Sequence, residues 1–401
     1  MTSRIILDIH ALQNVPPSNL NRDDTGAPKT AVYGGVIRPR VSSQAWKRAT
    51  RRAFDDLLDA RELGVRTKRV TELLADRIRA LSSEIDEVTA RELAAETLRT
   101  ATGSKIEVPK RRAGAKKDAD AESPEAAPES SYLMFLSSRQ FDGLAELAVE
   151  GAADIKGFLK NKDNKARAKQ IANSRHSVDI ALFGRMIADS ADINVDAAAQ
   201  VAHAIAVHRG DTESDYFTAV DDRNTDAEPG AGMIGTVDFN SATLYRYAAL
   251  DVDLLERNLG KGLRENEAPA TPVRRAVETF VHGFLASLPT GKINTFGNHT
   301  LPDAVVVKLR SARPISFVSA FEKPVLADHE SGGYMEAGCA ALADYIPEIE
   351  RAFGAESTAT WVLRVGPNTH KIADLGTEVA SLSALVQSVG AAVAERLEQR
   401  G

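Results

Sequence analysis

At residues 36–54 an extended run, Val36 to Val41, leads directly into a cationic amphipathic segment, and this junction constrains the fold more than any other part of the chain. Ser42 and Ser43 follow the extended run, and a serine hydroxyl there can accept hydrogen bonds from the free amides of a first helical turn. Helical spacing then places Trp46, Thr50 and Phe54 on one side. The pattern predicts a strand, then a helix that begins at Ser42 or Ser43 and packs through one side.

The other side of this predicted helix carries positive charge. Cations near a helix N-terminus are unfavourable unless an anion also arrives. Ser42, Ser43 and Gln44 add donors of the kind that bind phosphate. A merely solvated basic face is the alternative. The pattern favours a surface that binds the backbone of a polyanion. No acidic residue stands among the cations of this surface to neutralise them, and the cations are Arg38, Arg40, Lys47, Arg48, Arg51 and Arg52.

Composition bounds the class of protein. A chain of 401 residues with 43% hydrophobic content can bury a large core, in more than one lobe. It has no apolar run of membrane-spanning length and no signal-peptide core, so we expect a cytoplasmic protein without a membrane partner. The single Cys339 permits neither an internal disulfide nor a thiolate metal cluster. The net charge of −6 argues against coating of nucleic acid over the whole surface, but a local basic groove remains possible.

Apolar periodicity predicts an α+β fold, with strands and helices alternating around an inserted helical lobe. The lobe begins near residue 55. Within it, residues 103–131 consist of a basic half followed by an acidic half, and a segment of this composition cannot bury a core, so we expect a disordered loop there. A loop is predicted over residues 13–29. The predicted strands cover residues 4–12, 177–187, 233–250, 304–309 and 360–365, and the predicted helices cover residues 197–209, 253–259, 272–288, 335–353 and 377–400.

Three further features are candidates for binding. Lysines gather between residues 156 and 169, where a solvated helix face is the simplest interpretation. The order of segments between residues 205 and 236 predicts a projecting hairpin, and its Tyr216 and Phe217 lie in very polar sequence, where exposed aromatic rings indicate contact with something else. Met186 is either a core residue or a flexible apolar wedge.

The sequence offers little catalytic chemistry. Residues 286–293 lack the first glycine and the magnesium-binding hydroxyl of a nucleotide-binding loop, so no such loop is predicted. His203 and His208 are five residues apart and would not share one face of a helix, so no zinc site is predicted. We therefore expect no cofactor, no metal and no enzymatic activity. The alternative is a metal-dependent RNA endonuclease whose magnesium ion is held by acidic residues of the predicted hairpin. Acidic residues in loops more often face solvent than bind a metal. The candidate ligands are Asp211, Glu213, Asp215, Asp221, Asp222 and Asp226. A structural assembly protein without nucleic acid is a third interpretation.

Four motifs in this order resemble the CasC family, the backbone subunits of the type I-E CRISPR Cascade complex. They are Asn21–Asp24, Arg40–Arg48, Val178–Met186 and Asp215–Asp222. The resemblance implies a fold likened to a right hand, with an RRM-like (ferredoxin-like) palm, an inserted helical fingers lobe and a projecting thumb β-hairpin. In this chain the palm would comprise residues 1–54, 177–204 and 237–401, the fingers residues 55–176 and the thumb residues 205–236.

The resemblance also implies a function. Many copies would stack head to tail along a CRISPR guide RNA, bind it without regard to sequence, and present it for pairing with target DNA in antiviral defence. Other Cascade subunits and a separate nuclease-helicase that cuts the DNA would be partners. The residues implied for the RNA backbone are Arg22, Lys29, Ser42, Gln44, Lys47, Arg48 and Arg51, those for nucleotide displacement are Met186, Tyr216 and Phe217, and those for target DNA are Lys160, Lys162 and Lys165.

Overall fold

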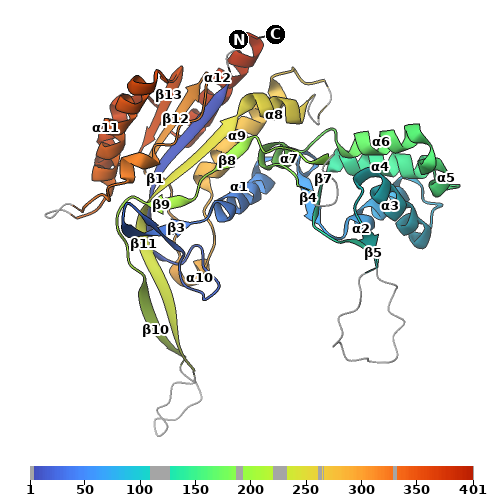
Figure 1. The fold of residues 1–401 in the computed structure, drawn as a ribbon, viewed down its shortest axis with the longest axis horizontal. Coiled ribbons are helices and arrows are strands. Elements are labelled where there is room, and N and C mark those ends of the chain that lie inside the picture. Colours follow the sequence, from blue (N-terminus) through green and yellow to red (C-terminus); the bar gives the residue numbers. More distant parts are fainter. Residues whose placement is uncertain are drawn as a thin grey trace, which may run out of the picture. The chain divides into compact units, whose positions relative to one another are not determined.

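A computed structural model describes residues 4–108, 127–186, 193–219, 233–260, 264, 266–327 and 332–400 (Figure 1). The chain divides into two compact units. The first comprises residues 1–56, 199–253 and 277–401, and the second comprises residues 57–198 and 254–276. In the described ranges, no helix combines the length and the apolar character that crossing a bilayer requires.

The first unit is built on one sheet, whose described strands run in the order β14-β13-β12-β1-β11-β9-β3-β2, with β8 and β10 also paired to β11. The pair β13 and β14 is parallel and the other pairs are antiparallel, so the sheet is mixed and the α+β prediction is confirmed. The strands are β1 Ile6–Ser18, β2 Thr30–Tyr33, β3 Val36–Val41, β8 Ala199–Val201, β9 Ala204–Ala206, β10 Glu213–Ala219, β11 Met233–Asp251, β12 Ala304–Arg310, β13 Ala359–Arg364 and β14 Thr377–Glu378.

Strand β1 differs from its prediction in two ways. It continues to Ser18, through the first residues of the predicted loop, because β11 pairs with it as far as Ser18, with a register shift after Val15 where Pro16 and Pro17 offer no amide hydrogen. The sequence predicts one buried side, yet Asp8 and His10 are buried as well. Both faces of the strand are therefore covered.

Alternation along β1 and β11 explains how both faces are filled. Leu12 and Tyr245 face the core formed with α11 (Met335–Phe353) and Phe317. Gln13 and Arg246 point to the opposite face, where Arg246 donates to the Phe284 carbonyl of α9 (Thr271–Ala286). Figure 1 shows α11 on one side of the sheet and α1 (Ser43–Leu57) with α9 on the other.

The second unit contains a helical core of its own. Leu74, Leu98 and Leu144 are among the buried residues of this core. Its first helices are α2 (Val70–Leu81), α3 (Glu87–Thr102), α4 (Ser138–Glu150), α5 (Ile155–Lys160) and α6 (Lys162–Ala172). Two short ribbons accompany them, β4 (Gly64–Thr67) with β7 (Met134–Ser137) and β5 (Ile106–Glu107) with β6 (Glu129–Ser130). Residues 109–126 of the segment predicted to be a disordered loop lie outside the described residues.

Three predicted elements are wrong in type or extent. Residues 178–183 form helix α7 (Val178–Phe183) instead of a strand, since so short an apolar run has no decisive period; it ends at Gly184, whose φ of +77° suits glycine. The predicted helix over residues 197–209 is instead β8 and β9, because pairing with β11 outweighs the helix propensity of alanine. The C-terminal helix, α12 (Leu382–Glu398), begins later than predicted, where the Ser381 hydroxyl accepts from the Ala384 amide.

Candidate nucleic-acid interface

The packed side of α1 is as predicted. Trp46, Thr50 and Phe54 are buried, and the Arg246 guanidinium lies 3.8 Å from the centre of the Trp46 ring. Helix α9 approaches closely at Gly283, where an added Cβ would lie 3.0 Å from the Phe54 ring. These contacts fix the rotation of α1 about its axis, and therefore the direction in which its remaining residues point.

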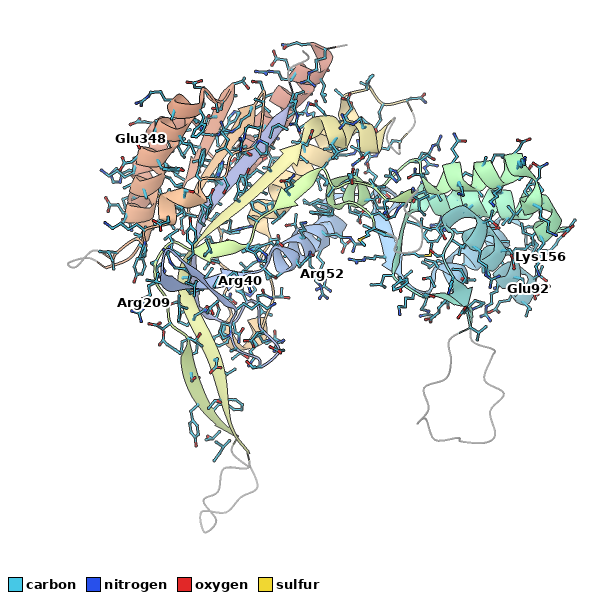
Figure 2. All side chains as sticks on the ribbon, in the orientation of Figure 1. Arg40, Arg52, Glu92, Lys156, Arg209 and Glu348 are labelled. Carbon is cyan, nitrogen blue, oxygen red and sulfur yellow. The ribbon has the colours of Figure 1, made fainter. Side chains whose placement is uncertain are left out.

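The cationic side of α1 is accessible. Gln44, Arg48 and Arg52 are exposed, and Lys47 and Arg51 are half-buried. Figure 2 labels Arg52 on α1 and Arg40 on the segment that leads into it. Among the described residues, no carboxylate forms a salt bridge with Lys47, Arg48 or Arg52. The charges of these side chains therefore remain available to an external anion.

One cation of the predicted group does not belong to this surface. Arg38 is buried, and its guanidinium donates to the backbone carbonyls of Ala206 at 3.0 Å, Phe321 at 3.0 Å and Glu322 at 3.2 Å. Desolvation by burial lowers the pKa of Arg38. Its role is structural, because it joins β3 to β9 and to the turn at residues 321–322.

Hydrogen bonds attach the loop before β2 to the start of α1. The Ser42 hydroxyl accepts from the Ala45 amide at 3.3 Å, as expected for the residue before the helix. The Ser42 amide in turn donates to the Asn21 side-chain oxygen at 2.9 Å. The Arg40 amide donates to the Lys29 carbonyl at 2.9 Å. Arg22, Lys29 and Ser42, predicted from separate segments, are therefore brought to one region.

The loop that carries Arg22 is ordered by Asp23. The Asp23 carboxylate accepts from the Thr25 hydroxyl at 2.7 Å, the Thr25 amide at 2.9 Å and the Ala27 amide at 3.1 Å. The hydrogen bond from the Thr25 hydroxyl is the main cause of a lowered pKa of Asp23, and the amide hydrogen bonds lower this pKa further. The negative charge of Asp23 is thus used within the loop, while the neighbouring Arg22 side chain is exposed.

The predicted hairpin is confirmed as β10 and β11. Tyr216 pairs with Thr236 and Phe217 with Gly235, so these adjacent aromatic residues point to opposite faces of the ribbon. Tyr216 is 60% exposed and Phe217 is 41% exposed. The Phe217 ring lies across Gly235, where an added Cβ would come within 2.5 Å of it. Tyr216 and Phe217 therefore present their rings on opposite faces of the ribbon.

The hairpin acids do not form a recognisable metal site in the part that is described. Asp211 lies 3.3 Å from Arg209, and Glu213 and Asp215 are exposed. Asp221, Asp222 and Asp226 lie outside the described residues. Across the described ranges, no group of three or more His, Cys, Asp or Glu side chains is arranged to hold a metal ion.

The remaining predicted residues belong to the second unit. Met186 follows α7 and is 83% exposed, which excludes the core interpretation. Lys160, Lys162 and Lys165 are exposed on α5 and α6, and within the described residues no acid forms a salt bridge with them. Arg167 on the same helix instead pairs with Glu150 at 2.8 Å.

A residue that the sequence did not single out also lies at the start of α1. The Nδ1 atom of His203 is 2.9 Å from the Arg40 Nη1 atom and accepts from the Ser43 amide at 3.3 Å. Strand pairing brings it there, since Arg40 is opposite Ile205 in the sheet. The sequence suggests no role for His203 once a zinc site is rejected, and no local signal indicates this contact.

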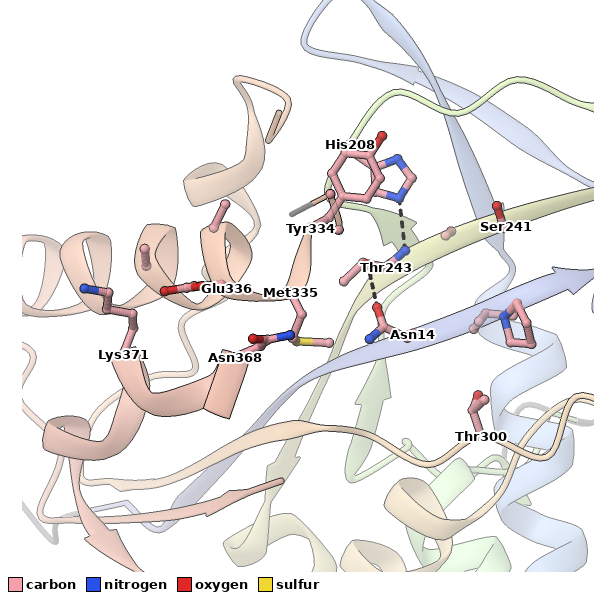
Figure 3. Close-up of a pocket in the computed structure, with 17 residues that line it drawn as sticks. Asn14, His208, Ser241, Thr243, Thr300, Tyr334, Met335, Glu336, Asn368 and Lys371 are labelled. Carbon is pink, nitrogen blue, oxygen red and sulfur yellow. Dashed lines mark hydrogen bonds between the residues drawn. The ribbon is translucent and has the colours of Figure 1, made fainter. Parts of the chain in front are cut away.

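A separate cavity of about 710 Å³ in the first unit contains His208 (Figure 3). The His208 Nε2 atom accepts from the Thr243 amide at 3.0 Å, and its Nδ1 atom lies 2.7 Å from the Arg209 carbonyl, so the ring is neutral with its hydrogen on Nδ1. Its ring stacks on Tyr334 with 3.7 Å between centroids. Burial lowers the pKa of His208, in keeping with a structural role between β11 and the start of α11.

Comparison with known proteins places the chain in a family. The model of the CT1975-like protein family matches residues 7–388. A chain of a solved structure described as "CRISPR RNA-guided surveillance complex, pre-nicking" is 35% identical, with a TM-score of 0.79 over 97% of this chain and 100% of that chain. A chain of a second, "CRISPR RNA-guided surveillance complex", is 32% identical, with a TM-score of 0.68 over 96% of this chain and 99% of that chain. No curated protein matched the sequence. Because the family model and both structural matches extend over nearly the whole length of the sequence, this chain belongs to the CT1975-like protein family.

Proposed function

We propose that this chain binds the guide RNA of a CRISPR RNA-guided surveillance complex by gripping the sugar-phosphate backbone. The observation that carries the proposal is the accessible cationic side of α1, where Lys47, Arg48 and Arg52 have no salt bridge with any described acid. Arg22 and Lys29 lie on a loop that hydrogen bonds attach to the start of the same helix. Contacts to phosphate carry no sequence information, which suits a protein that must hold any guide.

We further propose that the complex is a type I-E Cascade. Its helical backbone would consist of copies of this chain stacked head to tail, with an RRM-like palm, helical fingers and a thumb hairpin. The four motifs that resemble CasC support this assignment. The chain would have no catalytic role of its own: it would present the guide to target DNA, which Lys160, Lys162 and Lys165 would contact, while a separate nuclease-helicase cuts that DNA in the cytoplasm.

Extraction of nucleic acid from the assembly tests the first proposal. The protein is purified with its native partners at low salt, because phosphate contacts weaken steeply as salt rises. We expect RNA of one defined length, sensitive to ribonuclease and resistant to deoxyribonuclease. The same extraction from a variant with Lys29 and Lys47 both replaced by alanine should yield much less RNA. Purified assembly without RNA would contradict the proposal.

The aromatic rings of the hairpin provide a second test. Stacking of a base on an aromatic side chain contributes about 1–3 kcal/mol. Because Tyr216 and Phe217 occupy opposite faces of the ribbon, each ring should contact a different nucleotide of the RNA. The losses of RNA affinity caused by Tyr216→Ala and Phe217→Ala should then add. We expect bound RNA to show chemically reactive bases at a regular interval, and this periodic reactivity to fall in both variants.

Tyr132→Ala is the control for this second test, since it removes an aromatic ring that is 55% exposed in the other unit. Its reactivity pattern should match that of the unmodified protein. A periodic pattern that persists when both hairpin rings are replaced would contradict a role for the hairpin in displacing nucleotides.

A further inference from the structure

The Arg40 and His203 side chains form a contact at the start of α1, close to the cationic side of that helix. Arg40 is half-buried and His203 is exposed, so the contact contributes little to the core. The Nδ1 atom of His203 is 2.9 Å from Arg40 Nη1 and 3.3 Å from the Ser43 amide nitrogen. Guanidinium and amide groups can only donate, so Nδ1 accepts from both and the ring hydrogen is on Nε2. The ring is neutral in this arrangement.

The charges around His203 oppose its protonation. The pKa of His203 is lowered by burial first, and then by the positive charges of Arg40 on β3 and Lys29 before β2. Protonation would also place a hydrogen on Nδ1, between two donors. From α1, the Ser43 amide donates to the ring at the positive end of the helix dipole. A negative charge bound beside the ring would act in the opposite direction and favour the protonated form.

The donors that His203 occupies are those that a phosphate would use. A guanidinium presents a planar pair of donors that fits phosphate oxygens, and an amide in the first helical turn is a common phosphate ligand. Lys29 is joined to the same place, since the Arg40 amide donates to the Lys29 carbonyl at 2.9 Å. A phosphate that takes over Arg40 and the Ser43 amide would release Nδ1 and bring negative charge beside the imidazole.

We propose that His203 is a proton-linked contact for an RNA phosphate: in the free protein its neutral ring holds Arg40 and the Ser43 amide in place, and on binding it takes up a proton. This inference rests on the proposed RNA-binding function and adds a residue and a pH dependence to it. The sign follows from linkage. The RNA-bound protein holds more protons than the free protein. RNA affinity therefore rises as the pH falls through the interval between the pKa of His203 in the bound protein and its pKa in the free protein.

The test measures RNA affinity against pH at constant ionic strength, from about pH 8 to about pH 5.5, the range in which histidine titrates. The probe is an oligouridylate with a 5′-hydroxyl, because neither its bases nor its phosphodiesters titrate in that range. The variant is His203→Gln, whose amide oxygen can accept from Arg40 and Ser43 but takes up no proton. We expect affinity in the unmodified protein to rise by up to about tenfold for each pH unit, the limit for a single proton.

The affinity of His203→Gln should lose most of its pH dependence, so the difference from the unmodified protein should widen as the pH falls. Calorimetry in two buffers of different ionisation enthalpy should show proton uptake by the unmodified protein and less by the variant. Equal pH dependence in both proteins, or equal proton uptake, would overturn the role of His203 while leaving RNA binding intact. Failure of the unmodified protein to bind RNA at any pH would overturn the proposed function, and this inference with it.

Discussion

Replacing Lys29 and Lys47 together by alanine is expected to weaken RNA binding by roughly 100-fold at low salt, because a hydrogen bond to a charged group contributes about 1.5 kcal/mol and two such contacts would be lost. The loss should be the same for RNAs of different sequence, since only phosphate contacts are removed. The slope of log affinity against log salt concentration should flatten by about 1.4, the value for two phosphates of a single strand. Fluorescence anisotropy titrations at several salt concentrations give both quantities.

The matched control removes two lysines from elsewhere in the same unit. Lys323 and Lys371 are exposed, and neither lies on α1 or on the loop before β2. Their double replacement by alanine changes the net charge by the same amount. It should leave the affinity and the slope close to those of the unmodified protein. If both double variants weakened binding equally, net charge rather than this surface would be responsible.

The largest effect on stability is expected for Asp8→Ala. The fully buried Asp8 carboxylate accepts from Arg310 Nε at 2.6 Å, the Tyr247 hydroxyl at 2.9 Å and the Ile315 amide at 3.0 Å. Burial raises the pKa of Asp8 despite the opposing charge of Arg310. Removing one member of a buried ion pair costs about 3–5 kcal/mol, because the other charge is left uncompensated. Chemical denaturation followed by far-ultraviolet circular dichroism measures the loss.

A second variant shows whether charge imbalance causes this loss. Glu350 also contacts Arg310 at 2.7 Å and Lys308 at 3.0 Å, so the cluster holds two acids and two bases. Asp8→Ala combined with Arg310→Met leaves the Glu350 and Lys308 pair in balance. We expect the double variant to recover part of the stability that Asp8→Ala loses. A double variant as unstable as the sum of its parts would show that packing, and not charge, dominates.

Local patterns predicted α1 well. The spacing of Trp46, Thr50 and Phe54 is a helical period, and a side chain that must be buried fixes which side of the helix faces the core. The cations at the other positions of α1 then lie away from the side that packs. Helix α9 is predicted in the same way, from its amphipathic pattern and the Thr271-Pro272 start, while the hairpin is predicted from the order of the segments around it.

Other elements could not be predicted because partners distant in sequence decide them. Alanine-rich residues 199–206 became strands by pairing with β11, and residues 178–183 became a helix because an apolar run of that length fits either structure. Arg38 and Arg40 are two residues apart on one strand and look alike in sequence. The backbone of residues 321–322 accepts hydrogen bonds from the buried Arg38, whereas Arg40 stays half-buried and donates to the Thr30 carbonyl at 3.2 Å and to His203 Nδ1 at 2.9 Å.

The sequence by itself therefore determined that this protein carries a helix with one buried side and one cationic side, and a hairpin with exposed aromatic rings. The helix follows from periodicity, which acts over a few residues, and the hairpin follows from the order of segments and the polar sequence around its aromatic residues. Only the tertiary structure decided which cations remain accessible, how the loop with Arg22 and Lys29 joins α1, and that His203 holds Arg40 and the Ser43 amide. These depend on strand pairing between β3 and β9 and on hydrogen bonds between distant segments, which no local pattern encodes.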